Sequence, residues 1–233
     1  MKVRIRFSKD GCMKYIGHLD VMRYFQKALR RDGLPVSYTQ GYHPHPVMSF
    51  ASPLGIGVTS EGEYMDIGLD AEIPAEEIKE RLQGCMSEDI AVLSAVILPE
   101  EQKTNIMAEV SAADYLIRYQ EGCRPETADL AGCFERFLGQ SAILVRHKTK
   151  TKEEEIDIRS KIYAASLTQD GILLRLSSGS SFHLKPETVM LAFHEFAGFP
   201  FRREMLSIRR LELYKDGSDG LLPLGAAGKE NHE

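Results

Sequence analysis

The sequence predicts an α+β fold of two ferredoxin-like (split βαβ) halves packed together. The first observation is the order strand, helix, hairpin, helix and strand over roughly the first hundred residues, which is the order of that unit. The second is a further pass of similar order after a joint at residues 99–108. We therefore expect the first half at 1–105, the second half at 106–215, and a glycine-rich disordered tail at 216–233.

The first half begins with residues 2–8, where apolar and basic residues alternate, which predicts a strand with a basic outer side. A helix is expected over 18–32, because apolar residues recur there at helical spacing and form a buried stripe: Leu19, Met22, Phe25 and Leu29. Gly33 and Pro35 end this helix. A second helix begins at Pro74, and further strands are expected at 36–39, 47–51, 63–69 and 90–98.

The second half is assigned in the same way. Helices are expected over 126–138 and 186–196. Strands are expected over 113–119, 142–147, 156–162, 173–176 and 205–214. The two halves share no obvious sequence, so the repeat is inferred from the order of the elements alone.

Composition limits the class of protein. At 233 residues the chain suits one large domain or two small ones. No apolar run approaches 18 residues and the N-terminus has the pattern of a strand, not of a signal peptide, so we expect no membrane partner. The four cysteines are widely spaced and never form CxxC, which favours reduced thiols and a cytoplasmic location. A CxxxCxxC triad is missing from the sequence, so we expect no iron–sulfur cluster and no other cofactor on this chain.

The formal net charge of −5 hides an asymmetry along the chain. Residues 1–60 hold nine Lys and Arg against three Asp, a balance of +6, whereas residues 61–101 hold twelve Asp and Glu against two basic residues, a balance of −10. This split indicates either a site for a polyanion at the basic end or a basic face that the acidic segment of the same chain neutralises.

The uncharged stretch within residues 38–64 is the first candidate for a functional site. His43 and His45 alternate with prolines whose fixed φ angles hold the two imidazoles in an extended backbone. With His18 and Asp20 they offer the ligand types of a metal site, but HxH lacks the HExxH or paired-cysteine spacing of a zinc motif, and we assign no metal. Histidines that contact an anionic or nucleobase ligand remain one interpretation, and structural histidines with helix capping near His18 remain the other.

Two further groups have the chemistry of nucleic-acid contact. The polar side of helix 18–32 presents basic residues on one face, which favours phosphate contact or is simply a solvated face: Arg23, Lys27, Arg30 and Arg31. Tyr38, Gln40 and Tyr42 can stack on bases or bond to them, although aromatic residues in paired strands more often pack against neighbours. Glu61 and Glu63, two residues apart, can act as a general base or as ligands to a cationic group, or can simply lie at a hairpin rim.

Several segments together resemble the N-terminal signature of the radical SAM-linked proteins, a domain of unknown function. The family's patterns are roughly F-x-K-x-G, S/G-H-L-D, R-A-L-R-R-x-G-L-P, Y-S-Q-G-F-x-P-H-P, S-F-A-x-P-L and S-x-x-E-Y. In this chain the corresponding segments read FSKDG, GHLD, KALRRDGLP, YTQGYHPHP, SFASPL and SEGEY. The resemblance covers roughly the first quarter of the chain. Gly17 stands where Ser is common, Tyr42 stands for Phe, and His43 stands where Asn is frequent. The last difference argues against a shared HxH metal site.

The resemblance implies partnership with a radical SAM enzyme that supplies the iron–sulfur chemistry, and an RNA or ribosome-related substrate. We therefore expect a non-catalytic accessory or substrate-binding protein, with RNA as a second partner. The alternative is a stand-alone RNA-binding or RNA-processing enzyme that uses histidine acid–base chemistry. The residues expected to bind a ligand or RNA are His18, Asp20, Arg23, Lys27, Arg30, Arg31, Tyr38, Gln40, Tyr42, His43, His45, Ser49, Glu63 and Tyr64.

Overall fold

The computed structural model describes residues 1–100, 104–148, 153–180 and 182–226, and over these residues the chain is a mixed α and β protein with five α-helices. It divides into two compact units. Unit 1 consists of Met1–Ser111 and Arg210–Glu233, and unit 2 of Ala112–Arg209. Residues 101–103 of the expected joint and residues 227–233 of the expected tail lie outside the described residues.

Antiparallel strands form the sheet of unit 1. β1 (Lys2–Lys9) pairs with both β3 (Thr59–Gly68) and β4 (Val92–Leu98), and β3 also pairs with the short β2 (Met48–Phe50). These pairings give the order β4-β1-β3-β2. From Arg210 onward, β10 (Leu206–Gly217) also neighbours β3.

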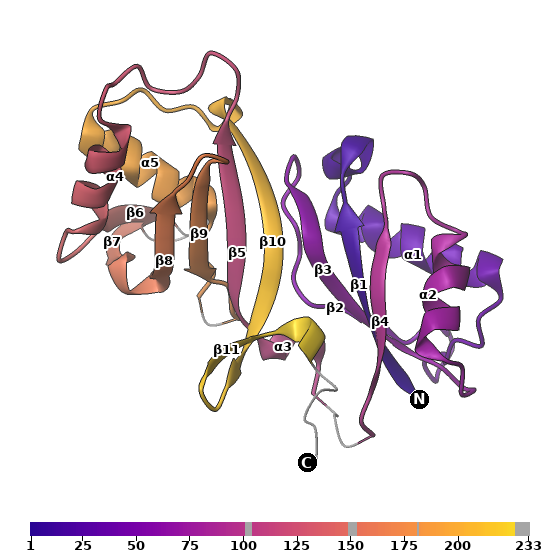
Figure 1. Cartoon of the computed structure of the whole chain (residues 1–233). Helices are drawn as coiled ribbons and strands as arrows, with labels where there is room; N and C mark the ends of the chain where they lie inside the picture. Colours follow the sequence, from indigo (N-terminus) through magenta and orange to yellow (C-terminus); the bar gives the residue numbers. More distant parts are fainter. Residues whose placement is uncertain (101–103, 149–152, 181, 227–233) are drawn as a thin grey trace. The chain divides into compact units, whose positions relative to one another are not determined.

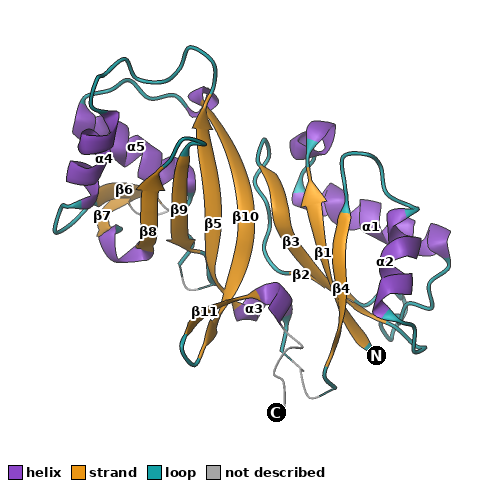
Figure 2. Cartoon of the chain, in the orientation of Figure 1, coloured by secondary structure: helices purple, strands orange, loops and turns teal. Residues whose placement is uncertain are grey.

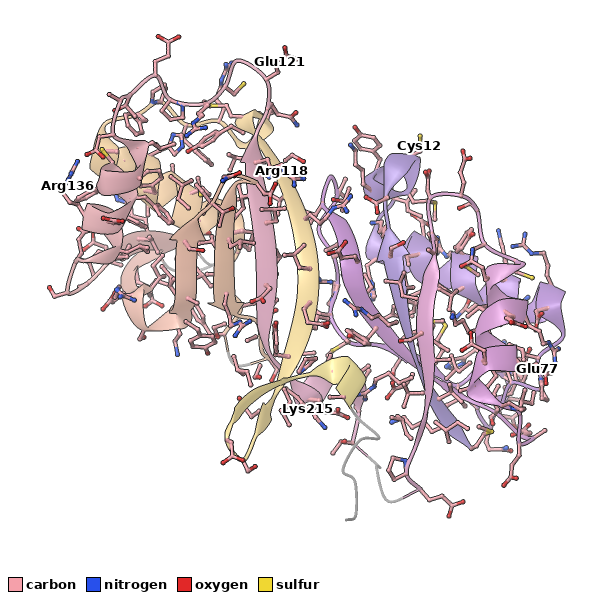
Figure 3. The ribbon with its side chains drawn as sticks, in the orientation of Figure 1. Cys12, Glu77, Arg118, Glu121, Arg136 and Lys215 are labelled. Carbon is pink, nitrogen blue, oxygen red and sulfur yellow. The ribbon has the colours of Figure 1, made fainter. Side chains whose placement is uncertain are left out.

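Two helices cover one face of this sheet (Figures 1 and 2). They are α1 (His18–Asp32), with the bounds that the sequence predicts, and α2 (Ala75–Gln83). The rings of Phe7, Phe25 and Phe50 meet beneath α1, with centroid separations of 4.7 to 6.0 Å. On the solvent side of α2, Glu77 pairs with Arg81 one helical turn away (Figure 3).

The expected buried stripe of α1 is partly wrong. Leu19 is 66% exposed, and Met22 is only partly buried. The helix instead buries Val21, Phe25, Ala28 and Leu29. Leu19 lies in the first turn of the helix. The apolar spacing continues there, but the hydrophobic core does not extend beneath that turn.

Unit 2 contains the second set of strands and helices. Its strands are β5 (Val110–Tyr119, from Ala112 onward), β8 (Ile162–Leu167), β9 (Ile172–Ser177) and the first residues of β10. β9 pairs antiparallel with β5 and β8, which gives the order β10-β5-β9-β8. The strands β6 (Leu144–Lys148) and β7 (Glu153–Asp157) form a separate hairpin.

The helices of unit 2 are α4 (Leu130–Leu138) and α5 (Pro186–Ala197). They contact each other through the rings of Phe134, Phe137 and Phe193. Next to this cluster, His194 is fully buried, with Nδ1 2.8 Å from the Pro200 carbonyl oxygen and Nε2 2.8 Å from the Tyr119 hydroxyl.

The end of the chain differs from the disordered tail expected from residue 216. β11 (Gly220–Pro223) pairs antiparallel with β10, and a short 3-10 turn follows at Leu224–Ala226. Leu224 is fully buried and its carbonyl oxygen accepts a hydrogen bond from Arg4. The glycines of this segment therefore form a hairpin and do not mark disorder over residues 216–226. The short helix α3 (Ile106–Glu109) belongs to the same unit.

None of the helices in the described part of the chain is long and apolar enough to cross a membrane.

Candidate functional site

A buried ionic cluster in unit 1 brings together residues from four of the signature segments. Glu63 faces the helix side of the sheet, because its register partner is the core residue Phe7. Lys9 stands opposite Ser60 in the same pair of strands. Ser52 follows β2, and Arg210 comes from β10, far away in sequence.

The carboxylate of Glu63 is fully engaged within this cluster. Arg210 binds it bidentately, with Nε donating to Oε1 at 2.8 Å and Nη2 donating to Oε2. The hydroxyl of Ser60 donates to Oε1 at 2.6 Å. Arg210 also donates to the carbonyl oxygen of Ser52 at 3.2 Å. Because Arg210 is 1% exposed and Glu63 is 4% exposed, this is a desolvated, charge-assisted pair that fixes strand β10 to strand β3.

Lys9 is the second cation in this buried cluster. It is 2% exposed, and its Nζ donates a hydrogen bond to the carbonyl oxygen of Ile16 at 2.9 Å. Burial lowers the pKa of the Lys9 ammonium; the carboxylate of Glu63 opposes this effect and the guanidinium of Arg210 adds to it. The hydrogen bond holds the chain before α1 against the end of β1.

His18 forms the outer side of the cluster. It is half-buried, with its ring edge-on to Phe50 at a centroid distance of 5.4 Å. Burial lowers the pKa of His18, and the nearby Lys9 and Arg210 lower it further against the opposing charge of Glu63. A cavity of about 10 Å³ lies among these side chains, which is room for one water-sized group.

The expected loop is a small exposed hairpin. Tyr38 bridges to Pro46, and the backbone N–H of Thr39 donates to the carbonyl oxygen of His45 at 2.9 Å. The Thr39 hydroxyl lies 3.1 Å from His45 Nδ1, so the second histidine is part of the loop's own hydrogen bonding. Tyr42 is fully exposed, at 102% of its reference area, and His43 is also exposed. Gln40 is exposed beside them.

The basic stripe of α1 is divided between internal partners and solvent. Arg23 pairs with Asp20 at 3.0 Å on the exposed side, and Arg31 donates to the carbonyl oxygen of Cys85 at 2.7 Å. Lys27 and Arg30 are exposed. An exposed pair of this kind contributes little to stability, so Arg23 stays accessible to an incoming anion.

Two of the predicted site residues lie on the opposite face of the sheet from His18 and Glu63. The hydroxyl of Tyr64 donates to Glu212 at 2.7 Å, and burial raises the pKa of Tyr64 together with the charge and the hydrogen bond of Glu212. Ser49 stands opposite Asp66 in the strand pair β2–β3 and lines a different cavity of about 260 Å³. The structure therefore does not bring Tyr64 and Ser49 together with the His18 cluster.

The basic outer side expected for the first strand is not exposed to solvent throughout. Arg4 is 1% exposed and donates to both oxygens of Asp66 and to Glu109. Arg6 pairs with Glu212 at 3.1 Å. Part of the basic charge of residues 1–60 is therefore neutralised within the chain, and the segment 61–101 supplies Asp66 for this purpose.

Sequence reasoning missed Arg210, Arg4 and the role of Lys9. For Lys9 and Arg210 a signal existed: Lys9 is in phase with the buried Val3, Ile5 and Phe7, and Arg210 with the buried Leu206 and Ile208. A charged residue in phase with a run of core positions predicts a buried ion pair or a ligand. Arg4 has no such signal in the sequence, because it lies between Val3 and Ile5 and therefore on the other face of the strand.

Among the side chains that the structure describes, no group of three or more His, Cys, Asp and Glu is arranged to hold a metal ion. Fold and site together define a mixed α and β protein whose signature residues form a closed ionic cluster and an exposed loop. The chain belongs to the family described as "Uncharacterized protein conserved in bacteria (DUF2344)", which matches residues 2–186. No curated protein matches the chain.

Proposed function

We propose that this protein is a non-catalytic accessory protein that binds substrate for a radical SAM enzyme, with RNA as the substrate class. The resemblance of its signature segments to radical SAM-linked proteins supports the partnership. A chain whose sequence lacks the CxxxCxxC triad needs a partner to supply a cluster. The proposal includes a cytoplasmic location, for which the unpaired cysteines Cys12, Cys85, Cys123 and Cys133 are the support.

The observation that carries the proposal is the contrast between the buried and the exposed signature residues. The buried residues Lys9, Ser60 and Glu63 hold the fold together through contacts within the chain. Tyr42 and His43 lie at the tip of a hairpin whose backbone the Thr39–His45 contacts fix. A rigid loop with an exposed aromatic ring loses little conformational entropy when it binds, which suits recognition.

RNA is favoured as the bound substrate by two features of unit 1. Tyr42 offers an exposed ring for stacking on a base, and no acidic residue occurs between Gly33 and Ser60 to repel phosphate. Lys27 and Arg30 on α1 add exposed positive charge.

The experiment is an affinity purification of the chain from a lysate of its native bacterium, with bound proteins and RNA both identified. We expect a radical SAM enzyme to be recovered together with RNA. Tyr42→Ala should remove most of the RNA, and Lys27→Glu with Arg30→Glu should weaken binding in a salt-dependent way. Lys79→Glu is the matched control, because Lys79 lies on α2 and not on α1, and it already pairs with Glu76 of the same helix. Recovery of neither partner would reject the proposal.

The second candidate function is an RNA-processing enzyme with histidine acid–base chemistry. The observation that favours it is the half-buried His18 beside Lys9 and Glu63, since lowered pKa values near charged partners are typical of acid–base residues. Its test is RNA cleavage by the purified chain without a partner. Cleavage that His18→Gln abolishes and His43→Gln does not would replace the accessory function with this one.

For the fold, we propose that both halves are ferredoxin-like units with boundaries near 1–105 and 106–215. The support is that each half follows the order β-α-β-β-α-β, with spatial orders β4-β1-β3-β2 and β10-β5-β9-β8. On this assignment the hairpin β6–β7 is an insertion in the second unit.

A further inference from the structure

The buried cluster of unit 1 holds more positive than negative charge. Lys9 and Arg210 are cations that are 2% and 1% exposed, and Glu63 is the carboxylate between them. Both oxygens of Glu63 are bound by Arg210, and one also accepts from Ser60. Lys9 donates one hydrogen bond, to the carbonyl oxygen of Ile16, although an ammonium has three N–H groups. A buried ammonium in this situation is strongly destabilised unless a further acceptor or counter-charge reaches it.

The cavity next to Lys9 is suited to such a counter-charge. It has a volume of about 10 Å³, which matches a single oxygen atom with its contacts and excludes a whole substrate molecule. Its polar lining consists of Lys9, His18, Ser52 and Glu63. Arg210 binds the Glu63 carboxylate from outside this lining, so the group of Lys9, Arg210 and Glu63 beside the cavity carries a net positive charge.

The cavity has an outer side through which a ligand can approach. His18 lines the cavity and is itself partly exposed, so it lies between Lys9 and solvent. Three large apolar side chains of unit 1 are exposed to solvent, and the first of them follows His18 in the sequence: Leu19 at 66%, Tyr15 at 65% and Ile56 at 66%. The segments of Tyr15 and Ile56 are joined by the hydrogen bond from Gly57 N–H to the Lys14 carbonyl oxygen at 2.8 Å. Such residues can contact the apolar part of an organic ligand whose charged end reaches Lys9.

Other occupants explain the site less completely. A water molecule would accept a hydrogen bond from Lys9 but would leave the cluster with one more cation than carboxylate. A deprotonated, nucleophilic Lys9 would need a carbonyl substrate beside it, for which the cavity is too small. We propose that Lys9 and His18 form a binding site for one anionic oxygen of an organic acid, contributed by a carboxylate or by a terminal phosphoryl group. The body of the ligand stays at the surface beside Leu19. No bond is made or broken.

This site is independent of the proposed partner, because anion binding is measured on the isolated chain. The probes are sodium formate, acetate and phosphate, compared at constant ionic strength with sodium chloride. Binding is followed by the line width of ¹³C-formate and by the shift in thermal midpoint, since a ligand that binds only the folded state raises that midpoint. We expect formate or phosphate to bind. If formate and acetate compete with each other for the site and phosphate does not compete with them, the carboxylate is the group that the site recognises.

The decisive variant is Lys9→Met, which keeps the length of the side chain and removes the charge. We expect its affinity for the bound anion to fall at least about tenfold, the size of a lost charge-assisted hydrogen bond. The control is Lys14→Met, because Lys14 lies over the ring of Tyr15 and does not line the cavity. Its affinity should stay within about twofold of the wild type, given the weak effect of exposed charges.

Two results would overturn the proposal: no binding of formate, acetate or phosphate to the wild-type chain, or equal binding by the wild type and Lys9→Met. If Lys9→Met does not fold, His18→Gln takes its place, since His18 is only half-buried. Affinity that falls in His18→Gln supports the site at this position, and unchanged affinity rejects it.

Discussion

At the scale of single residues, the pair of Arg210 and Glu63 has the largest expected effect on stability. Arg210→Met leaves the Glu63 carboxylate buried without its main partner, and we expect the free energy of unfolding to fall by about 3–5 kcal/mol. In the double variant Arg210→Met, Glu63→Leu no charge remains unpaired, so most of that loss should be recovered. Urea unfolding of both variants measures the difference, and equal losses would show that the pair itself is not what stabilises the sheet.

His194 in unit 2 gives a second prediction at this scale. Its Nδ1–H donates to the Pro200 carbonyl oxygen, which leaves Nε2 to accept from the Tyr119 hydroxyl, so the buried ring is neutral. Burial lowers the pKa of His194 below 6.5, against the opposing hydrogen bond to Pro200. The unfolded chain therefore binds the proton more tightly than the folded chain. The stability contributed by this residue is complete above pH 6.5 and is lost as the pH falls through the folded pKa.

The measurement for His194 is the urea midpoint of the wild type and of His194→Gln between pH 8 and pH 5. We expect the wild type to lose more stability on acidification than the variant does. His18→Gln serves as the comparison, because the pKa of His18 is also lowered and contributes with the same sign. A wild type and a His194→Gln variant with parallel pH profiles would contradict the assignment of a neutral His194.

At the scale of elements, the close approach of β3 and β10 in unit 1 depends on Gly62. A Cβ at this position would lie 2.4 Å from the Leu211 carbonyl oxygen and 2.6 Å from the Cα of Glu212. Both are backbone atoms, so the strands would have to separate. We expect Gly62→Ala to lower the free energy of unfolding by about 1–3 kcal/mol or more, the range for overpacking. The glycine of the SEGEY segment therefore has a packing role.

Gly55→Ala is the matched control for this prediction. A Cβ at Gly55 meets only Val58 Cγ2 at an ordinary distance of 3.6 Å, so thermal denaturation should show little change in its midpoint. If Gly62→Ala and Gly55→Ala have the same thermal midpoint, β10 can move away from β3 at little cost in stability.

The elements were predictable where periodicity and chain-breaking residues agreed. The helix 18–32 follows from apolar spacing and from Gly33, and the structure has it at the same residues. The exposure of Leu19 in the first turn of this helix was not predictable. A regular apolar pattern does not show how far along the helix the hydrophobic core extends. For the site, the signature residues His18 and Glu63 were found, while Arg210 comes from a strand about 150 residues away. Its phase with Leu206 and Ile208 marks Arg210 as a buried residue, but only the pairing of β10 with β3 identifies Glu63 as its partner.

At the scale of the whole molecule, the C-terminal segment completes unit 1. Arg210 binds Glu63, Glu212 binds Tyr64 and Arg6, and the Leu224 carbonyl oxygen accepts from Arg4. Leu224 itself is fully buried. Residues 1–111 alone would therefore expose apolar surface, leave the buried Glu63 without Arg210 and remove one hydrogen-bond acceptor from Arg4.

We predict that a fragment of residues 1–111 does not unfold cooperatively, whereas the same fragment joined to residues 210–226 does. Ser111 Oγ donates to the Tyr214 carbonyl oxygen at 3.2 Å, so the two ends to be joined lie within reach of a linker of about six glycine and serine residues. Circular dichroism during urea titration measures cooperativity for both fragments.

The control is the joined fragment with Arg210→Met. Its urea midpoint should fall, as we expect for the same substitution in the full chain. Cooperative unfolding of residues 1–111 with the midpoint of the joined fragment would show that the ion pairs of β10 are dispensable. The DUF2344 match, which ends at residue 186, would then cover all that unit 1 needs in order to fold.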